Sequence, residues 1–218
     1  MRASRSYLPG KLATVVNNEL LLRELELTES GFPVIHPETY VECTWIGFNS
    51  ARTCLEKAGH GVHFFLDDYQ FERVWDRLEV NTRNLDGFDV VASPDWSLYR
   101  DTHVRLQQWN HYRNNAVGAF WQQMGLHVFP TVAWSDESSY EWCFDGLPVG
   151  GVVMVSSVGT QAEAESRKLF LKGYDAMMER LQPAVVIFYG KVPDGCRGNI
   201  VRVKSWTERM KERERGLE

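Results

Sequence analysis

Short, continuously apolar segments alternate with amphipathic helical patterns along most of the chain. Because these apolar runs lack the alternation of a half-exposed strand, they are typical of parallel strands covered by helices on both faces. A first strand is expected at 43–48. The later runs predict strands at 62–66, 88–92, 127–132, 152–155 and 184–189, with a last one at 200–203.

Helices are predicted between these strands, over 69–81, 102–124 and 161–181, with shorter ones at 17–29 and 51–57. In the longest of them Trp109, Tyr112, Ala116 and Phe120 recur at helical spacing and predict one apolar stripe, with polar residues such as Arg113 and Asn114 lying off it. The pattern predicts an α/β protein with a mainly parallel sheet. We favour a TIM-like barrel, complete or incomplete, over an open doubly wound sheet.

The same pattern divides the chain into three parts. Residues 1–42 are expected to be an irregular N-terminal extension, 43–204 a single α/β domain, and 205–218 a charged tail. Opposite charges alternate in that tail, which favours a solvated helix.

Composition narrows the function classes. The 218 residues carry a net charge of -5, which argues against a protein whose whole surface binds nucleic acid, although a local basic patch is compatible with it. The four cysteines lack metal-binding or redox spacing, so reduced thiols are expected. The chain shows no signal peptide and no long apolar segment, so a cytoplasmic protein that does not contact a membrane is expected.

Acidic residues follow two of the predicted strands. Right-handed crossovers bring the carboxyl ends of parallel strands to one rim, where Asp67, Asp68 and Asp95 should gather with Tyr99 as a catalytic set. Neighbouring carboxyl groups can divide into an acid and a base, or Asp67 and Asp95 can hold Mg²⁺. The alternative is helix capping, with Asp101 as the cap of the helix that begins at Thr102.

The same rim should supply groups that bind an anionic, ring-containing ligand. Two cations and a Gly- and hydroxyl-rich turn suit phosphate, although the turn is no P-loop and could be an ordinary strand-to-helix turn. Aromatic side chains suit a ring, although tryptophans are also common core residues. The expected binding residues are Trp96, Arg100, Trp134, Ser156, Ser157, Gly159, Tyr189 and Lys191.

Several long segments resemble a known group of proteins. The segments SPDWSLY, WNHYRNNAVGAFWQQMG and WCFDG are similar to the signature segments of an uncharacterised family found in bacteria and their phages and plasmids. The resemblance covers about 43–190 and implies a cytosolic protein associated with mobile elements. It supplies no catalytic residues.

The leading hypothesis is therefore an enzyme of the hydrolase or transferase class that binds a nucleotide or phosphosugar at the rim, with Mg²⁺ as an option. An alternative is a non-catalytic phage or plasmid protein that binds nucleic acid or a host protein through Arg105, Arg113 and the basic tail. A third hypothesis, glycoside cleavage, depends on the separation of the carboxyl groups. The oligomeric state is left open.

Overall fold

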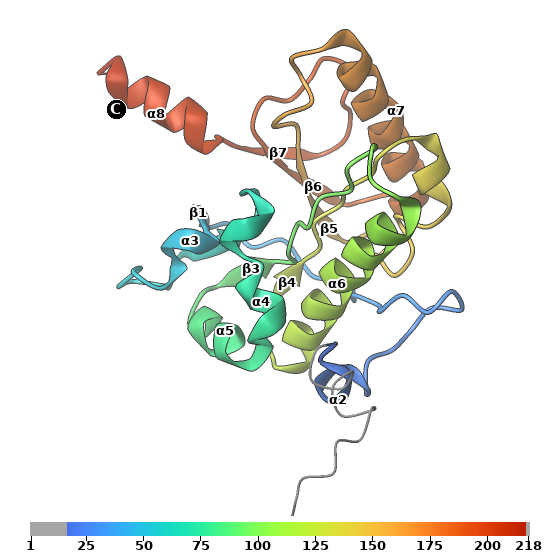
Figure 1. Cartoon of the computed structure of the whole chain (residues 1–218). Helices are drawn as coiled ribbons and strands as arrows, with labels where there is room; N and C mark the ends of the chain where they lie inside the picture. The colour runs from blue at the N-terminus through green and yellow to red at the C-terminus, as the bar shows by residue number, and fades with distance from the viewer. Residues whose placement is uncertain (1–16, 217–218) are drawn as a thin grey trace, which may run out of the picture.

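Short parallel strands form the centre of the fold, in a computed structural model that describes residues 17–216 (Figure 1). One sheet has the order β1 (Thr44–Gly47), β2 (His60–His63), β3 (Val90–Ala92) and β4 (Val128–Phe129). A second sheet has the order β5 (Val152–Ser156), β6 (Val185–Tyr189) and β7 (Ile200–Val203), and every pair in both sheets is parallel.

A parallel bridge between Thr131 and Met154 joins the two sheets. The Val132 N–H donates to the Met154 carbonyl at 2.8 Å, and the Met154 N–H donates to the Pro130 carbonyl at 2.8 Å. Pro130 has no N–H of its own, which accounts for the short β4 strand and the interrupted ladder. The strands thus follow one another in space in the order in which they occur in the chain, and the predicted parallel α/β architecture is confirmed.

The sheet is not closed by hydrogen bonds within the described residues, because β1 pairs only with β2 and β7 only with β6. Helix α8 (Trp206–Glu214) reaches across this seam, where Arg209 donates a hydrogen bond to the Trp45 carbonyl of β1 at 3.3 Å. A closed barrel is therefore not observed. The arrangement is a curved parallel array whose two edge strands are linked through a helix.

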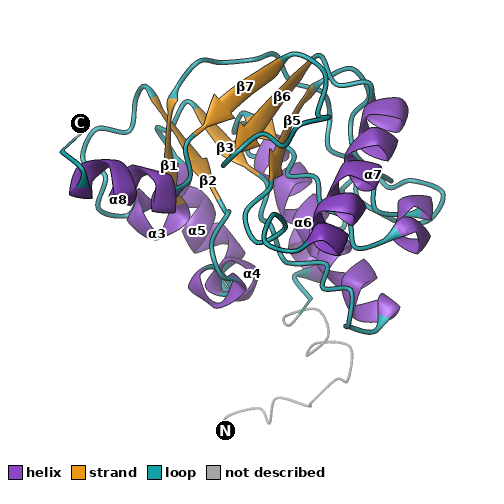
Figure 2. Ribbon diagram, turned by 90° about the horizontal axis from the view of Figure 1, so that it is seen from above, coloured by secondary structure: helices purple, strands orange, loops and turns teal. Residues whose placement is uncertain are grey.

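Helices lie on both sides of the strands and below them in the view of Figure 2. The two long ones are α6 (Val104–Gln123) and α7 (Ala164–Leu181), close to their predicted bounds. The other helical elements are α2 (Glu19–Leu22), α3 (Phe48–Ala51), α4 (Arg73–Asp76) and α5 (Leu78–Leu85), with the 3-10 turns η1 (Asp68–Gln70) and η2 (Glu137–Glu141). The short helices predicted at 17–29 and 51–57 are wrong in their bounds, because α2 covers only Glu19–Leu22 and α3 covers Phe48–Ala51.

The helix predicted over 69–81 is wrong as a single element. Arg77 leaves the helical conformation with φ -138° and ψ 55°, which separates α4 from α5. The Asn81 side chain donates to the Arg73 and Arg77 carbonyls, both at 2.9 Å, in addition to the backbone N–H groups that these carbonyls already accept, and so links the two helices across the break.

Helix α6 is buried on more than the predicted apolar stripe. Arg113 and Asn114, expected outside that stripe, are both buried. The helix is capped by the His103 side chain, which accepts from the Arg105 N–H, so the predicted cap at Asp101 is wrong. Its polar residues bind the loops that pass over it.

One hydrophobic core runs through both sheets and extends to the segment before β1, which contributes Leu25, Phe32 and Ile35. Helix α8, by contrast, has no buried residues, in agreement with the solvated helix predicted from its charges. Ser205 and Glu208 begin it with a reciprocal capping box.

Candidate functional site

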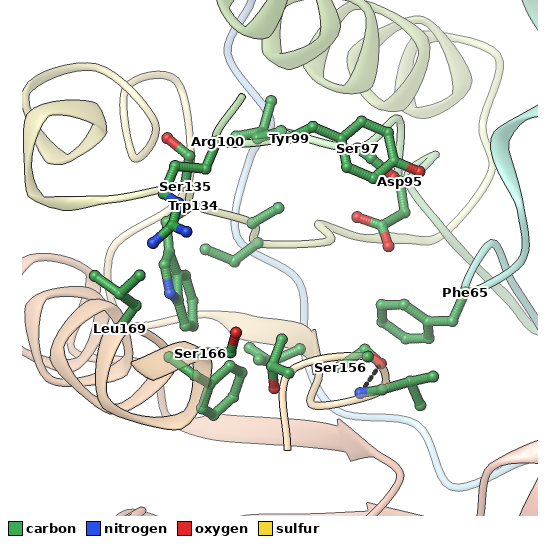
Figure 3. A pocket seen from close by; sticks show the side chains of 18 residues that line it. Phe65, Asp95, Ser97, Tyr99, Arg100, Trp134, Ser135, Ser156, Ser166 and Leu169 are labelled. Carbon is green, nitrogen blue, oxygen red and sulfur yellow. Dashed lines mark hydrogen bonds between the residues drawn. The ribbon is translucent and has the colours of Figure 1, made fainter. Parts of the chain in front are cut away.

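A cavity of about 410 Å³ opens at the carboxyl ends of β2 to β5, the rim on which the sequence places its candidate residues (Figure 3). Its volume is within the range of small-molecule sites. We call it the Asp95 cavity. Six of the candidates line it: Asp95, Tyr99, Arg100, Trp134, Ser156 and Gly159.

The Asp95 carboxyl group points into this cavity beside Phe65 (Figure 3). None of the described residues donates a hydrogen bond to it, although it lies deep in the molecule. Burial, with a smaller contribution from the charge of Asp68, raises the pKa of Asp95 well above its usual value of 3.8. Asp95 therefore holds a proton under conditions in which an exposed aspartate is ionised.

Asp68 lies near Asp95 but is held by Ser97 and does not line the cavity. Its carboxylate accepts from the Ser97 N–H at 3.2 Å and from the Ser97 hydroxyl at 2.9 Å. Burial raises the pKa of Asp68, and the hydrogen bonds from Ser97 and the charge of Arg113 offset part of that rise. The two carboxyl groups thus have different environments, as an acid and its charged neighbour require.

Asp67 is separate from this pair. It is exposed and accepts a hydrogen bond from Gln70 at 3.4 Å. Across residues 17–216 no three carboxylate, histidine or cysteine side chains converge as ligands for a metal ion. The structure does not bring Asp67 and Asp95 together in one cavity, because the Asp67 side chain is exposed and the Asp95 carboxyl group points into the Asp95 cavity.

Arg100 lies at the opposite end of the cavity from Asp95 (Figure 3). Its guanidinium donates to Glu165 in the first turn of α7 at 2.9 Å, and both side chains are more than half exposed. This contact ties the loop after β3 to α7. A ligand with an anionic group would have to compete with the Glu165 carboxylate for Arg100.

Trp134 forms the wall of the cavity next to α7. Its ring packs on Phe170 at 5.3 Å between centroids. A Cβ atom added to Gly173 would overlap the Trp134 indole, so the glycine at this position allows the ring to lie against the helix. Trp134 and Phe170 give the cavity an aromatic wall on which a ring can pack.

The turn after β5 presents its residues to two different cavities. Ser156 lines the Asp95 cavity, and its hydroxyl accepts from the Val158 N–H at 3.1 Å. Ser157 is buried and its hydroxyl donates to the Lys191 carbonyl at 2.6 Å. Ser157 and Lys191 line a second cavity, which shares Val158 and Gly159 with the first.

Trp96 and Tyr189 lie away from both cavities. Trp96 is fully buried, donates from its indole to Glu72 at 2.6 Å and packs against the Arg113 guanidinium at 4.2 Å from the ring centre. The Tyr189 ring packs on His63 and Phe65, and its hydroxyl accepts from the Trp206 N–H at 2.9 Å. The expected stacking of Trp96 on a ligand is replaced by packing in the core.

Arg113 is likewise unavailable to a nucleic acid. It is buried, paired with Glu72 and hydrogen-bonded to Asn110 at 2.7 Å. Among the basic residues that the sequence offered for nucleic-acid binding, Arg105 and the α8 residues Lys211 and Arg213 are exposed.

Sequence reasoning missed the polar side chains of α6 that hold the site loop. Asn114 accepts from the Trp96 N–H at 2.9 Å and donates to the Trp96 carbonyl at 3.2 Å, while Asn110 donates to the Ser97 carbonyl at 2.8 Å. These bonds fix the backbone that directly follows Asp95. The available signal was a run of asparagines in a helix, where this residue is unfavourable unless its side chain has a role.

Comparison with known proteins adds a family. The sequence model of the family described as a domain of unknown function (DUF4417) matches residues 27–207. The chain is 34% identical over 186 residues to the Gene 1 protein of Mycobacterium phage D29, covering 83% of this chain and 69% of that protein. It is 32% identical over 186 residues to the Gene 1 protein of Mycobacterium phage L5, covering 84% of this chain and 80% of that protein. No solved structure matches the chain.

None of the helices in residues 17–216 combines the length of a membrane span with sufficient apolar character.

Proposed function

This chain belongs to the DUF4417 family, and we propose that it is an enzyme that binds a small anionic, ring-containing ligand in the Asp95 cavity. The ligand class is a nucleotide or a phosphosugar. The observation that carries the proposal is a carboxyl group that points into a cavity of ligand size and faces an arginine across it, with a pKa that burial raises.

In this function Asp95 acts as a general acid. A water molecule or an acceptor hydroxyl group forms the new bond to the transferred group, and Asp95 donates its proton to the leaving group as the old bond breaks and becomes a carboxylate. Arg100 binds the anionic part of the substrate, and Trp134 packs on its ring. Asp68 is a positioning residue, because its charge favours the protonated form of Asp95 without touching the substrate. The reaction class is hydrolysis or group transfer.

A thermal-shift screen of nucleotides and phosphosugars tests this proposal. A ligand that binds the folded state raises the unfolding temperature by linkage. We expect at least one phosphorylated compound to stabilise the wild-type protein, and Arg100→Gln and Trp134→Leu to reduce that stabilisation. Asp67→Asn is the matched control, because Asp67 is an exposed acid outside the cavity. If the phosphorylated compound stabilised the wild type and both cavity variants equally, the result would contradict the proposal.

The relatives and the free cysteines support a proposal for where this activity takes place. Two relatives are encoded by mycobacteriophages, which supports a role associated with a phage or another mobile element. All four cysteines are free, as in proteins of a reducing compartment, which supports action in the cytoplasm of the bacterial host.

A further inference from the structure

A second cavity, of about 490 Å³, lies between the turn after β5 and helix α8. We call it the α8 groove. One wall is formed by residues 157–162 and the opposite wall by the side of α8, with Gly190 and Lys191 at the end of β6 between them. The groove adjoins the Asp95 cavity, since both are lined by Val158 and Gly159.

Three cations line the α8 groove: Lys191, Lys211 and Arg215. None of their side chains forms an ion pair or hydrogen bond with another residue in the described part of the chain. Lys211 and Arg215 are four residues apart and therefore project from the same side of the helix. All three are exposed, so their charges are directed into a hydrated groove.

The acidic residues of the groove are already paired with other cations. Glu208 is bound by Arg202 and by the Ser205 N–H, and Glu212 is bound by Lys204 at 2.7 Å. Neither Arg202 nor Lys204 lines the groove. Cations outside the groove thus neutralise its two carboxylates. The three cations that line the groove then give it an excess of positive charge.

We propose that the α8 groove binds the phosphate groups of the ligand whose ring occupies the Asp95 cavity. This inference rests on the proposed function and narrows its substrate class to a nucleotide that carries more than one phosphate. Phosphate oxygens accept hydrogen bonds from all three cations, and several closely spaced charges are needed to engage them together. The phosphates come either from a free nucleoside polyphosphate or from a single-stranded oligonucleotide.

The experiment compares four probes by titration calorimetry on the full chain: tripolyphosphate, adenosine, adenosine triphosphate and a short oligothymidylate. The variant is Lys211→Gln/Arg215→Gln. The control is Arg52→Gln/Lys168→Gln, which removes the same charges at exposed positions outside both cavities. We expect the groove variant to bind tripolyphosphate and the triphosphate about tenfold more weakly, because charge-assisted hydrogen bonds are lost. The groove variant should bind adenosine with the same affinity as the wild type, and the control variant should bind all four probes as the wild type does.

Added salt should weaken tripolyphosphate binding to the wild type, because exposed charges are screened. An oligothymidylate that binds more tightly than the triphosphate would identify a strand as the source of the phosphates; the reverse order would identify a free nucleotide. Unchanged tripolyphosphate affinity in the groove variant, or an equal loss in the control, would overturn the inference.

The two proposals can fail separately. If nucleotide binding requires Arg100 and Trp134 but not the groove cations, the groove inference fails and the proposed function stands. If tripolyphosphate binds through the groove cations while no ring-containing ligand depends on Arg100 or Trp134, the proposed function fails and the groove remains an anion site.

Discussion

Burial of the Asp95 carboxyl group, together with the nearby charge of Asp68, raises the pKa of Asp95 well above its usual value. Since its pKa is raised in the folded state, the folded protein holds this proton over a pH range in which the unfolded chain has lost it. Stability therefore falls as the pH rises from about 4 through the raised pKa of Asp95.

The variant Asp95→Asn should remove this pH dependence, because asparagine resembles the neutral carboxyl group and does not ionise. We expect its unfolding temperature to exceed that of the wild type by a margin that grows as the pH is raised from about 4 to about 8. Thermal unfolding at a series of pH values measures the margin, with Asp67→Asn as the control. A margin that shrinks with rising pH would show that Asp95 is ionised in the folded protein.

The ion pair between Arg100 and Glu165 should limit the affinity of Arg100 for an anionic ligand. Glu165→Gln removes the carboxylate that competes for its guanidinium. Because exposed ion pairs contribute little to stability, we expect the unfolding free energy to change by less than about 1 kcal/mol while affinity for an anionic ligand rises severalfold. Titration with the phosphorylated compound found by the thermal-shift screen checks this, and Glu179→Gln on the exposed part of α7 is the control. Weaker binding would mean that Glu165 orients Arg100 for the ligand.

Single residues also show which positions around the cavity could be predicted from the sequence. Asp95, Arg100 and Trp134 were found because they follow predicted parallel strands, whose carboxyl ends meet. Trp96 was misjudged for an equally simple reason. Successive side chains of an extended segment point to opposite sides, so when Asp95 enters the cavity its neighbour must enter the core. The sequence alone does not say which of the two faces which side.

At the scale of single elements, α7 positions the aromatic wall of the site through Gly173. Gly173→Ala would by itself favour the helix by about 1 kcal/mol, but the added methyl group overlaps the Trp134 indole. Overpacking in a core costs roughly 1–3 kcal/mol, so we expect a net loss of stability and a displaced ring. Urea unfolding and tryptophan fluorescence measure the two effects.

A second substitution distinguishes this clash from other effects on the helix. In a Trp134→Leu background the indole is absent, so Gly173→Ala should become neutral or stabilising there. If the alanine were equally destabilising in both backgrounds, contact with Trp134 would not be the reason for the glycine.

The elements were predicted best where one apolar face dominates. β5, β6 and α7 lie within a few residues of their predicted bounds, because burial follows the apolar pattern there. The break at Arg77 was missed, since it depends on the side chain of Asn81 from the next helix. The burial of Asn114 was missed because its partner, the Trp96 backbone, lies in a separate loop.

At the scale of the whole molecule, α8 is the part that depends least on the core. A chain ending at Ser205 would lose the hydrogen bonds from Trp206 to Tyr189 and from Arg209 to the Trp45 carbonyl. At roughly 1 kcal/mol each, their loss should lower the unfolding free energy by about 2 kcal/mol and leave the fold intact. Denaturant unfolding and far-ultraviolet circular dichroism measure this. A chain that fails to fold without α8 would show that the helix is required to hold the two edge strands in place.

The succession of strands in space has a consequence for the way this molecule is made. Each strand pairs with the one synthesised just before it, so the parallel array can grow at its free edge while the rest of the chain is still emerging from the ribosome. The contact between Arg209 and Trp45, 164 positions apart, joins the two ends of the described array. That closure can form only when synthesis is nearly complete, and we expect it to be among the last steps of folding.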